Sequence, residues 1–402
     1  MHAETEEAIP QYPFRNPGPL EPATEWARLR REEPLARVRM ASGDEVVLLT
    51  RYEDVRQILS DPRFSRQLTA EDAATVSDTE GAAFQPTPTP PTGEGHRRWR
   101  QVLGRTFSTK RMDAMRPAIM AMADQLLDGM VSRGAPGNLV GDFGHPLPVW
   151  VICELIGLPA DDRERFAFWS NTMLNLTRYS REEIVAAQNE IDEYFYRHIA
   201  AKRAKPGDDL LSELIAIADA GDGRLSEAEL VSTGQILLVA GHETSANMIG
   251  KMVAMLLDDR RRWEALLADP SLVRSTVEEA LRLDVNFGFG IPRYLSEPVE
   301  VGGTTLPRGT TVVCNISAAN RDEEAFEDAE RMELRRSPNS HVTFGIGPHS
   351  CLGQALARIE LQCALEVLLR RLPSLELTVP AGELRVRDGL IVGGLEELPV
   401  RW

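Results

Sequence analysis

A cysteine at the end of a glycine-rich loop is the feature that most limits what this chain can fold into. Residues 344–353 read Phe-Gly-Ile-Gly-Pro-His-Ser-Cys-Leu-Gly, and a run with helical patterning follows them through Leu369. Backbone N–H groups at the start of a helix have no intrahelical partner and lie at the positive end of its dipole. This position is expected to lower the pKa of the Cys351 thiol, and the thiolate is the form that binds metals. Because Gly345 and Gly347 let the backbone turn tightly beside a flat ligand, the loop predicts an axial thiolate for haem.

The other three cysteines carry no such signal. Cys153, Cys314 and Cys363 lie in apolar runs, where a free cysteine is usually a small buried hydrophobe. Cys351 has a second interpretation as the nucleophile of a cysteine hydrolase. That class needs a histidine with an Asn or Asp orienter, whereas His349 is only two residues away on the same loop. Haem ligation is therefore preferred over a nucleophilic or a purely structural cysteine.

Charge and composition exclude several other classes. The net charge of −16 and the pI near 5.1 argue against nucleic acid as the main partner. Four cysteines without CxxC spacing suit a reducing cytosol rather than a disulfide framework. The acidic, polar first seven residues resemble neither a signal peptide nor a membrane anchor, and no apolar run approaches the ~20 residues of a spanning helix. We expect a cytoplasmic protein with no membrane partner.

The residue patterning predicts a mainly α protein with small β-sheets, folded as a single domain. We expect an extended segment over residues 1–24 and one domain over 25–402, in which the proline-rich stretch 71–95 is a mobile loop, either a surface loop with no task or a lid or binding loop. Two hairpins are expected, one from 36–40 with 45–49 and one from 299–301 with 310–316. Short strands are expected at 375–379 and 390–402, and helices at 117–132, 184–204, 226–258 and 271–283.

One long helix carries a polar interruption. Ser226 and Glu229 have capping-box spacing at its start, and an apolar run then indicates a buried helix. Residues 240–245, Ala-Gly-His-Glu-Thr-Ser, then place polar side chains and a glycine inside this buried helix. Buried polar groups destabilise a fold unless they are hydrogen-bonded, and a glycine in a helix interior costs about 1 kcal/mol relative to alanine. Because such violations cluster at functional sites, we expect a groove and a proton path here. The alternative is a kink in which Thr244 bonds back to a carbonyl four residues earlier, and both can hold together. His242 is expected to face solvent or to form a salt bridge.

The cysteine loop and this interruption together resemble the cytochrome P450 family. The loop matches the family's cysteine signature at every signature position, and residues 240–245 resemble its oxygen-activating helix. Glu279-Ala280-Leu281-Arg282 resembles the family's Glu-x-x-Arg pair, whose i,i+3 spacing suits a bidentate ion pair. Arg331 falls where the family's third partner lies, although Met332 departs from the usual aromatic residue. The resemblance covers residues 21–402.

This resemblance implies the cytochrome P450 fold, heme b (iron protoporphyrin IX) as the cofactor, and a role for each matched residue. Cys351 would be the metal ligand, and Glu243 and Thr244 would deliver protons during oxygen activation. The implied cofactor-binding residues are His96, Arg100, Arg293, Phe344, His349, Cys351 and Gly353. By the same resemblance, 71–95 is the mobile substrate-access loop. The implied substrate pocket comprises Phe84, Leu174, Leu237, Ala240, Gly241, Phe287, Phe289, Ile291, Ile391 and Val392.

The resemblance also implies an enzyme that activates O2 and hydroxylates or epoxidises a medium-sized hydrophobic or aromatic substrate in secondary metabolism. Electrons would come from NAD(P)H through ferredoxin reductase and ferredoxin, to a monomeric enzyme. An acidic ferredoxin would be steered to a basic patch on an otherwise acidic chain. This patch consists of Arg97, Arg98, Arg105, Lys110 and Arg111.

Two other functions stay open at this point. One is oxidative C–C or C–N coupling of aromatic substrates by the same haem-thiolate chemistry, which the mass of the product would distinguish from oxygenation. The other is a haem-based sensor that uses the thiolate only for ligation. Turnover with a redox partner would separate the sensor from an enzyme.

Overall fold

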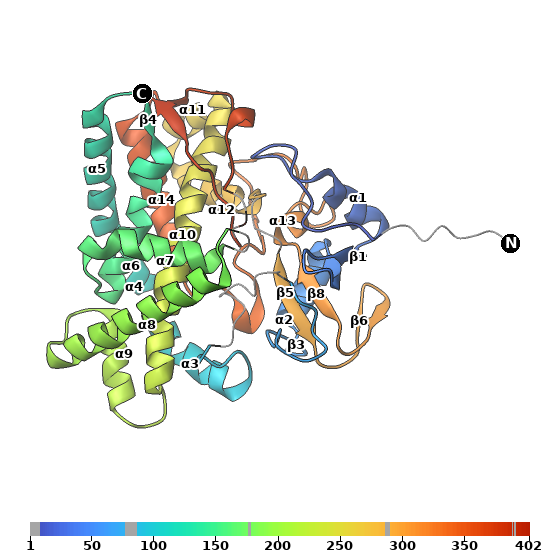
Figure 1. Cartoon of the computed structure of the whole chain (residues 1–402). Coiled ribbons are helices and arrows are strands. Elements are labelled where there is room, and N and C mark those ends of the chain that lie inside the picture. Colours follow the sequence, from blue (N-terminus) through green and yellow to red (C-terminus); the bar gives the residue numbers. More distant parts are fainter. Residues whose placement is uncertain (1–8, 77–86, 176–177, 286–289, 388, 390) are drawn as a thin grey trace.

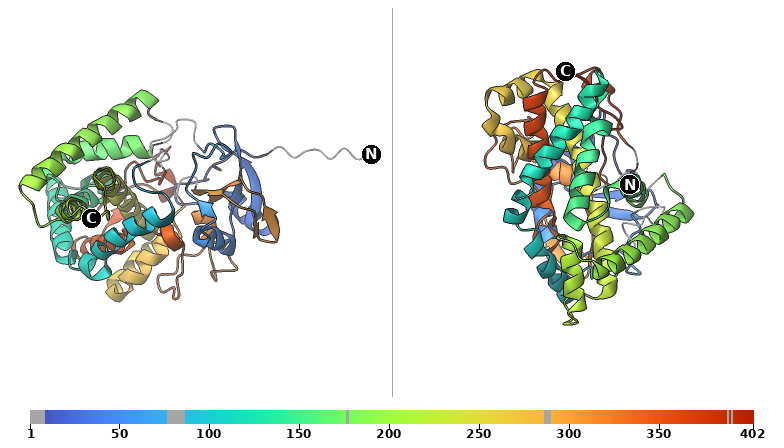
Figure 2. Two further views of the ribbon diagram at one scale, coloured as in Figure 1. Left: turned by 90° about the horizontal axis from the view of Figure 1, so that it is seen from below. Right: turned by 90° about the vertical axis from the view of Figure 1, so that its left-hand side faces the viewer.

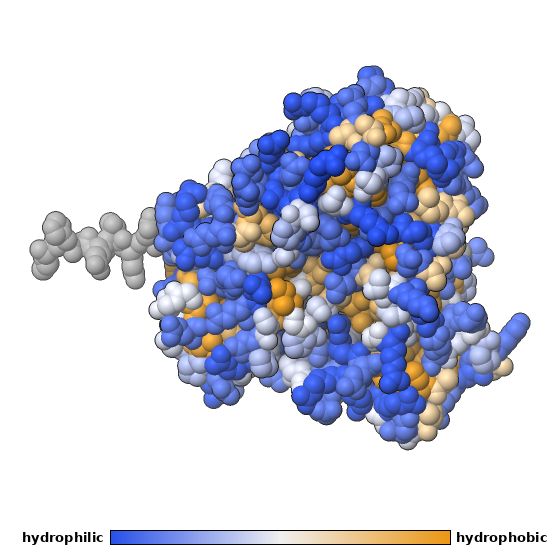
Figure 3. Space-filling model, turned by 180° about the vertical axis from the view of Figure 1, so that it is seen from behind, coloured by the Kyte–Doolittle hydropathy of each residue, from blue (hydrophilic) through white to orange (hydrophobic). Residues whose placement is uncertain are grey.

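Helices form most of the molecule, with a smaller sheet-containing part to one side (Figure 1). The computed structural model describes residues 9–76, 87–175, 178–285, 290–387, 389 and 391–402. Within these residues no helix combines the length and the apolar character needed to cross a bilayer. The view in Figure 3 shows a mainly hydrophilic surface with scattered apolar residues, as the net charge of −16 leads one to expect.

The largest sheet has five strands in the order β1-β2-β8-β5-β3. Its strands are β1 (Leu35–Arg39), β2 (Glu45–Leu49), β8 (Thr311–Cys314), β5 (Ile291–Leu295) and β3 (Phe64–Ser65). β1 and β2 pair antiparallel from Leu35↔Leu49 to Arg39↔Glu45, so the first predicted hairpin is confirmed. β8 runs parallel to β2 and antiparallel to β5, so it joins strands that are far apart in the sequence.

The second predicted hairpin has a different partner strand. β6 (Val299–Val301) pairs with β7 (Thr304–Leu306), across a turn in which Gly302 and Gly303 have φ of 55° and 77°. The predicted pairing of residues 310–316 with 299–301 is therefore wrong. The physical reason is burial: all four residues of β8 are buried, which suits a central strand and not an exposed hairpin.

The C-terminal strands are shorter than predicted. β9 (Glu376–Leu377) and β10 (Pro399–Arg401) pair antiparallel, and β4 (Gly137–Asn138) adds a third strand from the helical part. Two-residue strands carry too little patterning for the sequence to reveal them, so β4 was not predicted.

The predicted helices are confirmed, with ends within three residues of the expected positions. The α-helices are α1 (Thr24–Glu32), α2 (Tyr52–Ser60), α3 (Gly93–Thr106), α4 (Thr109–Asp113), α5 (Arg116–Arg133), α6 (Pro146–Ile156), α7 (Arg163–Leu174), α8 (Arg181–Ala204), α9 (Leu210–Asp219), α10 (Glu227–Asp258), α11 (Arg260–Ala268), α12 (Val273–Arg282), α13 (Ile316–Ala319) and α14 (Gln354–Arg371). Short helical turns lie at Val140–Gly144, Ala160–Asp162, Pro270–Leu272, Gly347–His349 and Ala381–Glu383.

Helix α10 is the central element of the helical part. It starts at the predicted capping box, in which Ser226 and Glu229 each bond to the other's backbone N–H. α10 packs against α6, α7, α8 and α14, and Figure 2 shows α5, α14 and α10 running side by side. Glycines permit the closest of these contacts: a Cβ on Gly241 would lie 2.6 Å from the Ile152 side chain of α6. Each fully buried leucine or isoleucine on this helix contributes about 1.5–3 kcal/mol.

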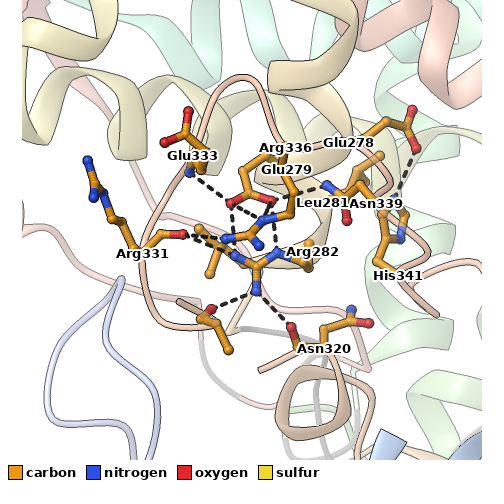
Figure 4. Close-up of polar contacts among 12 residues, drawn as sticks. Glu278, Glu279, Leu281, Arg282, Asn320, Arg331, Glu333, Arg336, Asn339 and His341 are labelled. Atoms are coloured by element: carbon orange, nitrogen blue, oxygen red, sulfur yellow. Dashed lines mark hydrogen bonds and ion pairs between the residues drawn. The ribbon is translucent and has the colours of Figure 1, made fainter. Parts of the chain in front are cut away.

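A buried ion-pair network fixes the end of α12 (Figure 4). Arg282 donates to both carboxylate oxygens of Glu279 at 2.8 Å, and both side chains are fully buried. The remaining donors of Arg282 reach the carbonyls of Asn320, Ala329 and Arg331 at 2.6–3.1 Å. The chain that leads to the cysteine loop is thereby bonded to α12.

The third member of this network is Arg336, so the prediction of Arg331 is wrong. Arg336 Nε lies 3.1 Å from both oxygens of Glu279, whereas Arg331 contributes only its backbone carbonyl and its side chain is exposed. Figure 4 shows the Arg331 side chain pointing away from the carboxylate. Asp328 has φ of 47° in the turn just before Arg331, and it is position 336, further along the chain, that lies beside Glu279.

Candidate active site

The cysteine loop is closed by backbone hydrogen bonds. The N–H of Cys351 donates to the carbonyl of Phe344 at 2.7 Å, and the N–H of Gly345 donates to Val342 at 2.8 Å. Gly345 and Gly347 have φ of 65° and 72°, which glycine adopts without strain. A Cβ on Gly347 would lie 2.8 Å from the Leu59 carbonyl at the end of α2. The two glycines are thus required by backbone conformation and by close packing, as the sequence predicts.

Cys351 is the exposed cysteine of the chain, whereas Cys153, Cys314 and Cys363 are buried as predicted. Desolvation by the surrounding protein nevertheless raises the pKa of the Cys351 thiol. The amides of Gly353 and Gln354 and the charges of Arg100 and Arg358 act in the opposite direction but do not outweigh it. The expected net lowering by the helix terminus is therefore wrong for the protein alone. A coordinating thiol is nevertheless deprotonated by the charge of the metal itself.

Arg358 connects the cysteine loop to α12, a contact that was not predicted. Its guanidinium lies 4.4 Å from the ring centroid of Phe344, and its Nε donates to Glu278 at 2.8 Å. Glu278 also lies 3.0 Å from His341, just before the loop. The half-buried Phe344 is thereby held on the loop beside Cys351.

Four predicted propionate-binding side chains, two histidines and two arginines, come together from three separate elements. His96 and Arg100 share one face of α3, Arg293 belongs to β5, and His349 lies in the loop itself. The rings of His96 and His349 are 4.3 Å apart. Desolvation, followed by the charges of Arg293, His96, Arg66 and Arg100, lowers the pKa of His349 to about 3. Desolvation likewise lowers the pKa of Arg293 to about 10.

Arg66 is a fifth member of this group, and the sequence did not predict it. β3 and β5 pair through Ser65↔Tyr294, so Arg66 continues the register opposite Arg293. Its charge acts on His96, His349 and Arg293. The register of a two-residue strand is what brings it here, and no local motif signals that.

These five groups fit a flat ligand that carries two negative charges. None of the ion pairs among the described residues involves them, and Nδ1 of His349 is buried without a hydrogen-bond partner. The guanidinium of Arg293, although buried, donates only to the neighbouring Pro292 carbonyl among the described residues. Three arginines gathered beside two neutral imidazoles, without a carboxylate, are costly to desolvate unless an anion arrives. Haem propionates beside an exposed thiol satisfy this arrangement.

Helix α10 has an open face near its middle. Ala240 is exposed in the middle of an otherwise buried helix, Thr244 one turn later is half-buried, and Leu237 one turn earlier is 8% exposed. The Thr244 hydroxyl donates to the Ala240 carbonyl at 3.2 Å, and the helix continues through this point. The predicted hydrogen bond from Thr244 to the carbonyl four residues earlier is therefore present, together with an open face of the helix. The predicted kink is not seen, because the helix continues without a break.

The two residues before Thr244 lie on other, buried faces of α10. Glu243 is 3% exposed and forms an ion pair with Arg387 at 2.6 Å, on a different face from Thr244. His242 is fully buried, with Nδ1 2.8 Å from the Leu238 carbonyl. The expectation that His242 faces solvent or forms a salt bridge is wrong, because the neighbouring helices enclose this face of α10.

The predicted pocket residues divide into three groups. Leu174, Ile291, Ile391 and Val392 are each half-buried, and the N–H of Ile391 donates to the Leu174 carbonyl at 3.0 Å. Gly241 is wrongly placed in the pocket, since its Cα faces Ile152 of α6. Phe84, Phe287 and Phe289 lie outside the described residues, as does the middle of the 71–95 loop.

Gly353, a predicted cofactor-binding residue, directly precedes α14 and has open space at its Cα.

Comparison with known proteins agrees with this geometry. Residues 264–380 match the family model described as Cytochrome P450. The chain is 41% identical to nocardicin C N-oxygenase from Nocardia uniformis subsp. tsuyamanensis, over 97% of this chain and 98% of that protein. This chain belongs to the cytochrome P450 family. It is also 39% identical to the mycinamicin IV hydroxylase/epoxidase of Micromonospora griseorubida, over 97% and 98% of the two chains.

A solved structure confirms that this cytochrome P450 has the family fold throughout its length. The LnmA cytochrome P450 hydroxylase from the leinamycin pathway of Streptomyces atroolivaceus superposes with a TM-score of 0.88 at 41% identity, covering 98% of this chain and 100% of that one. The predicted fold class is thereby confirmed. The protein is a cytochrome P450 monooxygenase, of the haem-thiolate class that its relatives represent.

A buried acid next to this site leads to a prediction about pH. Glu360 of α14 is fully buried, and Ser245 of α10 approaches it without reaching hydrogen-bonding geometry. Burial raises the pKa of Glu360 from 4.5 to about 8. Between pH 4.5 and about 8 the folded protein thus keeps a proton on Glu360 that the unfolded chain releases. The free energy of unfolding therefore falls as pH rises through this range, by up to about 1.4 kcal/mol per pH unit.

Glu360→Gln is expected to remove this slope and to unfold at a higher temperature than wild type above about pH 8. Thermal unfolding of both proteins across the neutral-to-alkaline range measures it. Glu366→Gln, on the same helix at a part-exposed carboxylate paired with Arg116, serves as the control. Equal slopes for wild type and Glu360→Gln would show that Glu360 is ionised in the folded state.

Proposed function

We propose that this monooxygenase hydroxylates or epoxidises a medium-sized hydrophobic or aromatic molecule of secondary metabolism. The observation that carries this proposal is the exposed Cys351 thiol on a loop whose His349 lies among three arginines and a second histidine, none of them in an ion pair among the described residues. When bound, haem supplies the iron at which O2 is activated, and the overall reaction consumes two electrons and two protons, giving oxygenated product and water. The names of the two relatives support this substrate class.

The chain's own residues would hold the cofactor from two sides. Cys351 would ligate the metal, and Phe344, fixed by Arg358, would limit water around the sulfur. His96, Arg100, Arg293 and His349 would bind the propionates, and we add Arg66 to this set. Charge-assisted hydrogen bonds of this kind are stronger than neutral ones, so they offset the cost of burying the cations.

Thr244 and Glu243 would deliver the two protons. The Thr244 hydroxyl donates its single proton to the Ala240 carbonyl, so its oxygen lone pairs are free to accept a hydrogen bond from water in the open face. Glu243, one residue earlier, is 3% exposed and pairs directly with half-buried Arg387 at 2.6 Å. A carboxylate linked to the surface and a hydroxyl at the site are the parts of a proton path.

Thr244→Ala is expected to lower the product formed per NAD(P)H consumed by roughly tenfold, with peroxide as the balance. The haem content and the affinity for substrate should change little, because the side chain is small and only half-buried. Thr244→Ser keeps the hydroxyl and is the matched control, which should recover most of the coupling. Wild-type coupling in Thr244→Ala would remove this residue from the proton path.

The substrate is best found by titration. Compounds are screened for shifts of the haem Soret band, and each hit is incubated with NAD(P)H and a surrogate ferredoxin system before the product mass is measured. A mass increase of one oxygen atom supports the proposal. A product that joins two substrate molecules would indicate oxidative coupling instead, and hits without any turnover would indicate a haem-based sensor.

Ferredoxin, supplied with electrons by its reductase, is the electron donor we propose, and the structure sharpens the test. Within the basic patch, Arg97 pairs with Glu94, Arg98 with Glu229 and Arg111 with Glu213. Glu229 is nearly buried in the α10 capping box, so a change at Arg98 would disturb folding as well as docking. Arg105 and Lys110 are exposed and are the better probes.

Arg105→Glu and Lys110→Glu are each expected to slow ferredoxin-supported reduction several-fold at low ionic strength, with the difference fading in high salt. Stopped-flow reduction under carbon monoxide measures the rate. Arg401→Glu, an exposed arginine on β10, is the charge-matched control. Equal rates for all three variants would place the docking site elsewhere.

A further inference from the structure

A stripe of three polar residues along α10 binds the C-terminal loop, defined here by residues 387, 389 and 391–394. Glu243, Asn247 and Lys251 follow one another at four-residue intervals and so share one face of the helix. Glu243 receives Arg387 at 2.6 Å, Asn247 donates to the Val392 carbonyl at 3.0 Å, and Lys251 donates to the Gly393 carbonyl at 2.8 Å. Each member of the stripe therefore holds a different point of the loop.

The loop is pressed against this stripe. A Cβ on Gly394 would overlap the side-chain amide of Asn247, so only glycine fits there. Lys251 is fully buried and is neutralised by Asp284 at 2.7 Å. The same loop carries Ile391 and Val392, which belong to the candidate pocket. The stripe thus joins a pocket wall to the helix that carries Thr244.

Arg387 has contacts beyond α10. Its guanidinium also lies 3.4 Å from Nε2 of His145, just before α6, and 3.3 Å from Oδ1 of Asn171 on α7. Because arginine only donates, the His145 nitrogen facing it is unprotonated. One turn after Asn171, the Leu174 carbonyl accepts the N–H of Ile391. The loop is therefore bonded to α10 and to α7 at once.

We propose that Arg387 is a positioning residue for Glu243, which it holds at the junction of the C-terminal loop, α6 and α7. The carboxylate is 3% exposed and Arg387 is its one cationic partner among the ion pairs of the described residues. Any displacement of α7 or of the loop by substrate acts on Arg387 and thereby on the orientation of Glu243. Substrate occupancy of the pocket is thus coupled to proton delivery. The inference rests on the proposed function of Glu243.

The test compares Arg387→Gln, Arg387→Lys, Glu243→Gln and the double variant Arg387→Gln/Glu243→Gln as holoenzymes. Arg385→Gln is the matched control, since Arg385 lies two residues away, 70% exposed, and pairs with Glu396 and Glu397 on the surface. We expect Arg387→Gln to lower the product formed per NAD(P)H consumed by about tenfold. This loss is smaller than the decrease of about 100-fold that typically follows removal of a proton-transferring side chain itself. In the Glu243→Gln background the second change should have no further effect, and Arg387→Lys should recover part of the loss.

Amide hydrogen exchange gives a readout that is independent of turnover. Arg387→Gln should accelerate exchange at 391–395 and at 171–175, whereas Arg385→Gln should not. Additive losses in the double variant, or equal effects of Arg387→Gln and Arg385→Gln, would overturn the inference. Failure of the proposed function looks different: all variants, wild type included, would lack the thiolate-type carbon monoxide spectrum or would not turn over any compound.

Discussion

Glu279→Gln is expected to destabilise the protein by about 3–5 kcal/mol, the cost of removing one partner of a buried ion pair. The Glu279 carboxylate is fully buried and accepts from Arg282, Arg336 and Asn339 and from the Glu333 backbone. Burial opposes its ionisation, but these hydrogen bonds outweigh that effect and hold the pKa of Glu279 below its usual value. The substitution leaves Arg282, itself fully buried, without a counter-charge.

A loss of this size is a large share of the 5–15 kcal/mol that stabilises a typical domain. We therefore expect little folded holoprotein from Glu279→Gln at 37 °C, and an early unfolding transition in urea followed by circular dichroism. Because the carboxylate pKa is depressed, its contribution is present at neutral pH and is lost as pH falls below the usual value for glutamate.

The matched pair for this prediction is Arg336→Gln against Arg331→Gln. Arg336→Gln should also destabilise strongly, since its guanidinium contacts both oxygens of Glu279. Arg331→Gln should change stability by less than about 0.5 kcal/mol, as an exposed side chain outside the network does. If Arg331→Gln were the more damaging of the two, the arrangement in Figure 4 would be wrong.

Cys351→Ala is expected to abolish oxygenation completely while leaving the fold in place. The side chain is exposed, its loop is closed by backbone bonds of Gly345 and Cys351, and α14 begins three residues later, so removing the sulfur creates no cavity in the core. The metal would lose the thiolate whose electron donation favours oxygen activation. Product formation, haem content and far-ultraviolet circular dichroism measure the three consequences.

The other cysteines supply the controls. Cys153→Ala and Cys363→Ala remove buried thiols that touch no part of the site, and burial raises the pKa of each to about 12, so neither is a thiolate. Both should keep turnover, with at most a modest loss of stability. Retained turnover in Cys351→Ala would refute the assignment of Cys351 as the metal ligand.

Local sequence signals predicted the parts of the fold and the site that depend on local chemistry. The capping box at Ser226, the helix that starts there and the positive φ of the glycines in the cysteine loop all follow from local residue chemistry, and the structure confirms each of them. His96 and Arg100 were predicted on one face of α3 because four-residue spacing on a helix determines that.

The features that the sequence did not reveal depend on long-range packing. Arg336 replaces Arg331 because the turns of residues 320–336 decide which arginine reaches Glu279. Arg66 joins the cations through strand register, and Arg387 reaches Glu243 from 144 positions away in the chain. Burial of His242 depends on the helices around α10 and not on its polar neighbours. Hydrophobic periodicity carries no information on such contacts.

The most direct test of the whole account is the absorption spectrum of the reduced, carbon monoxide-bound wild-type protein. We predict the red-shifted band that distinguishes thiolate-ligated haem, and its loss in Cys351→Ala but not in Cys363→Ala. A band typical of histidine-ligated haem in the wild type, or an unchanged red-shifted band in Cys351→Ala, would contradict the claim that Cys351 holds the iron.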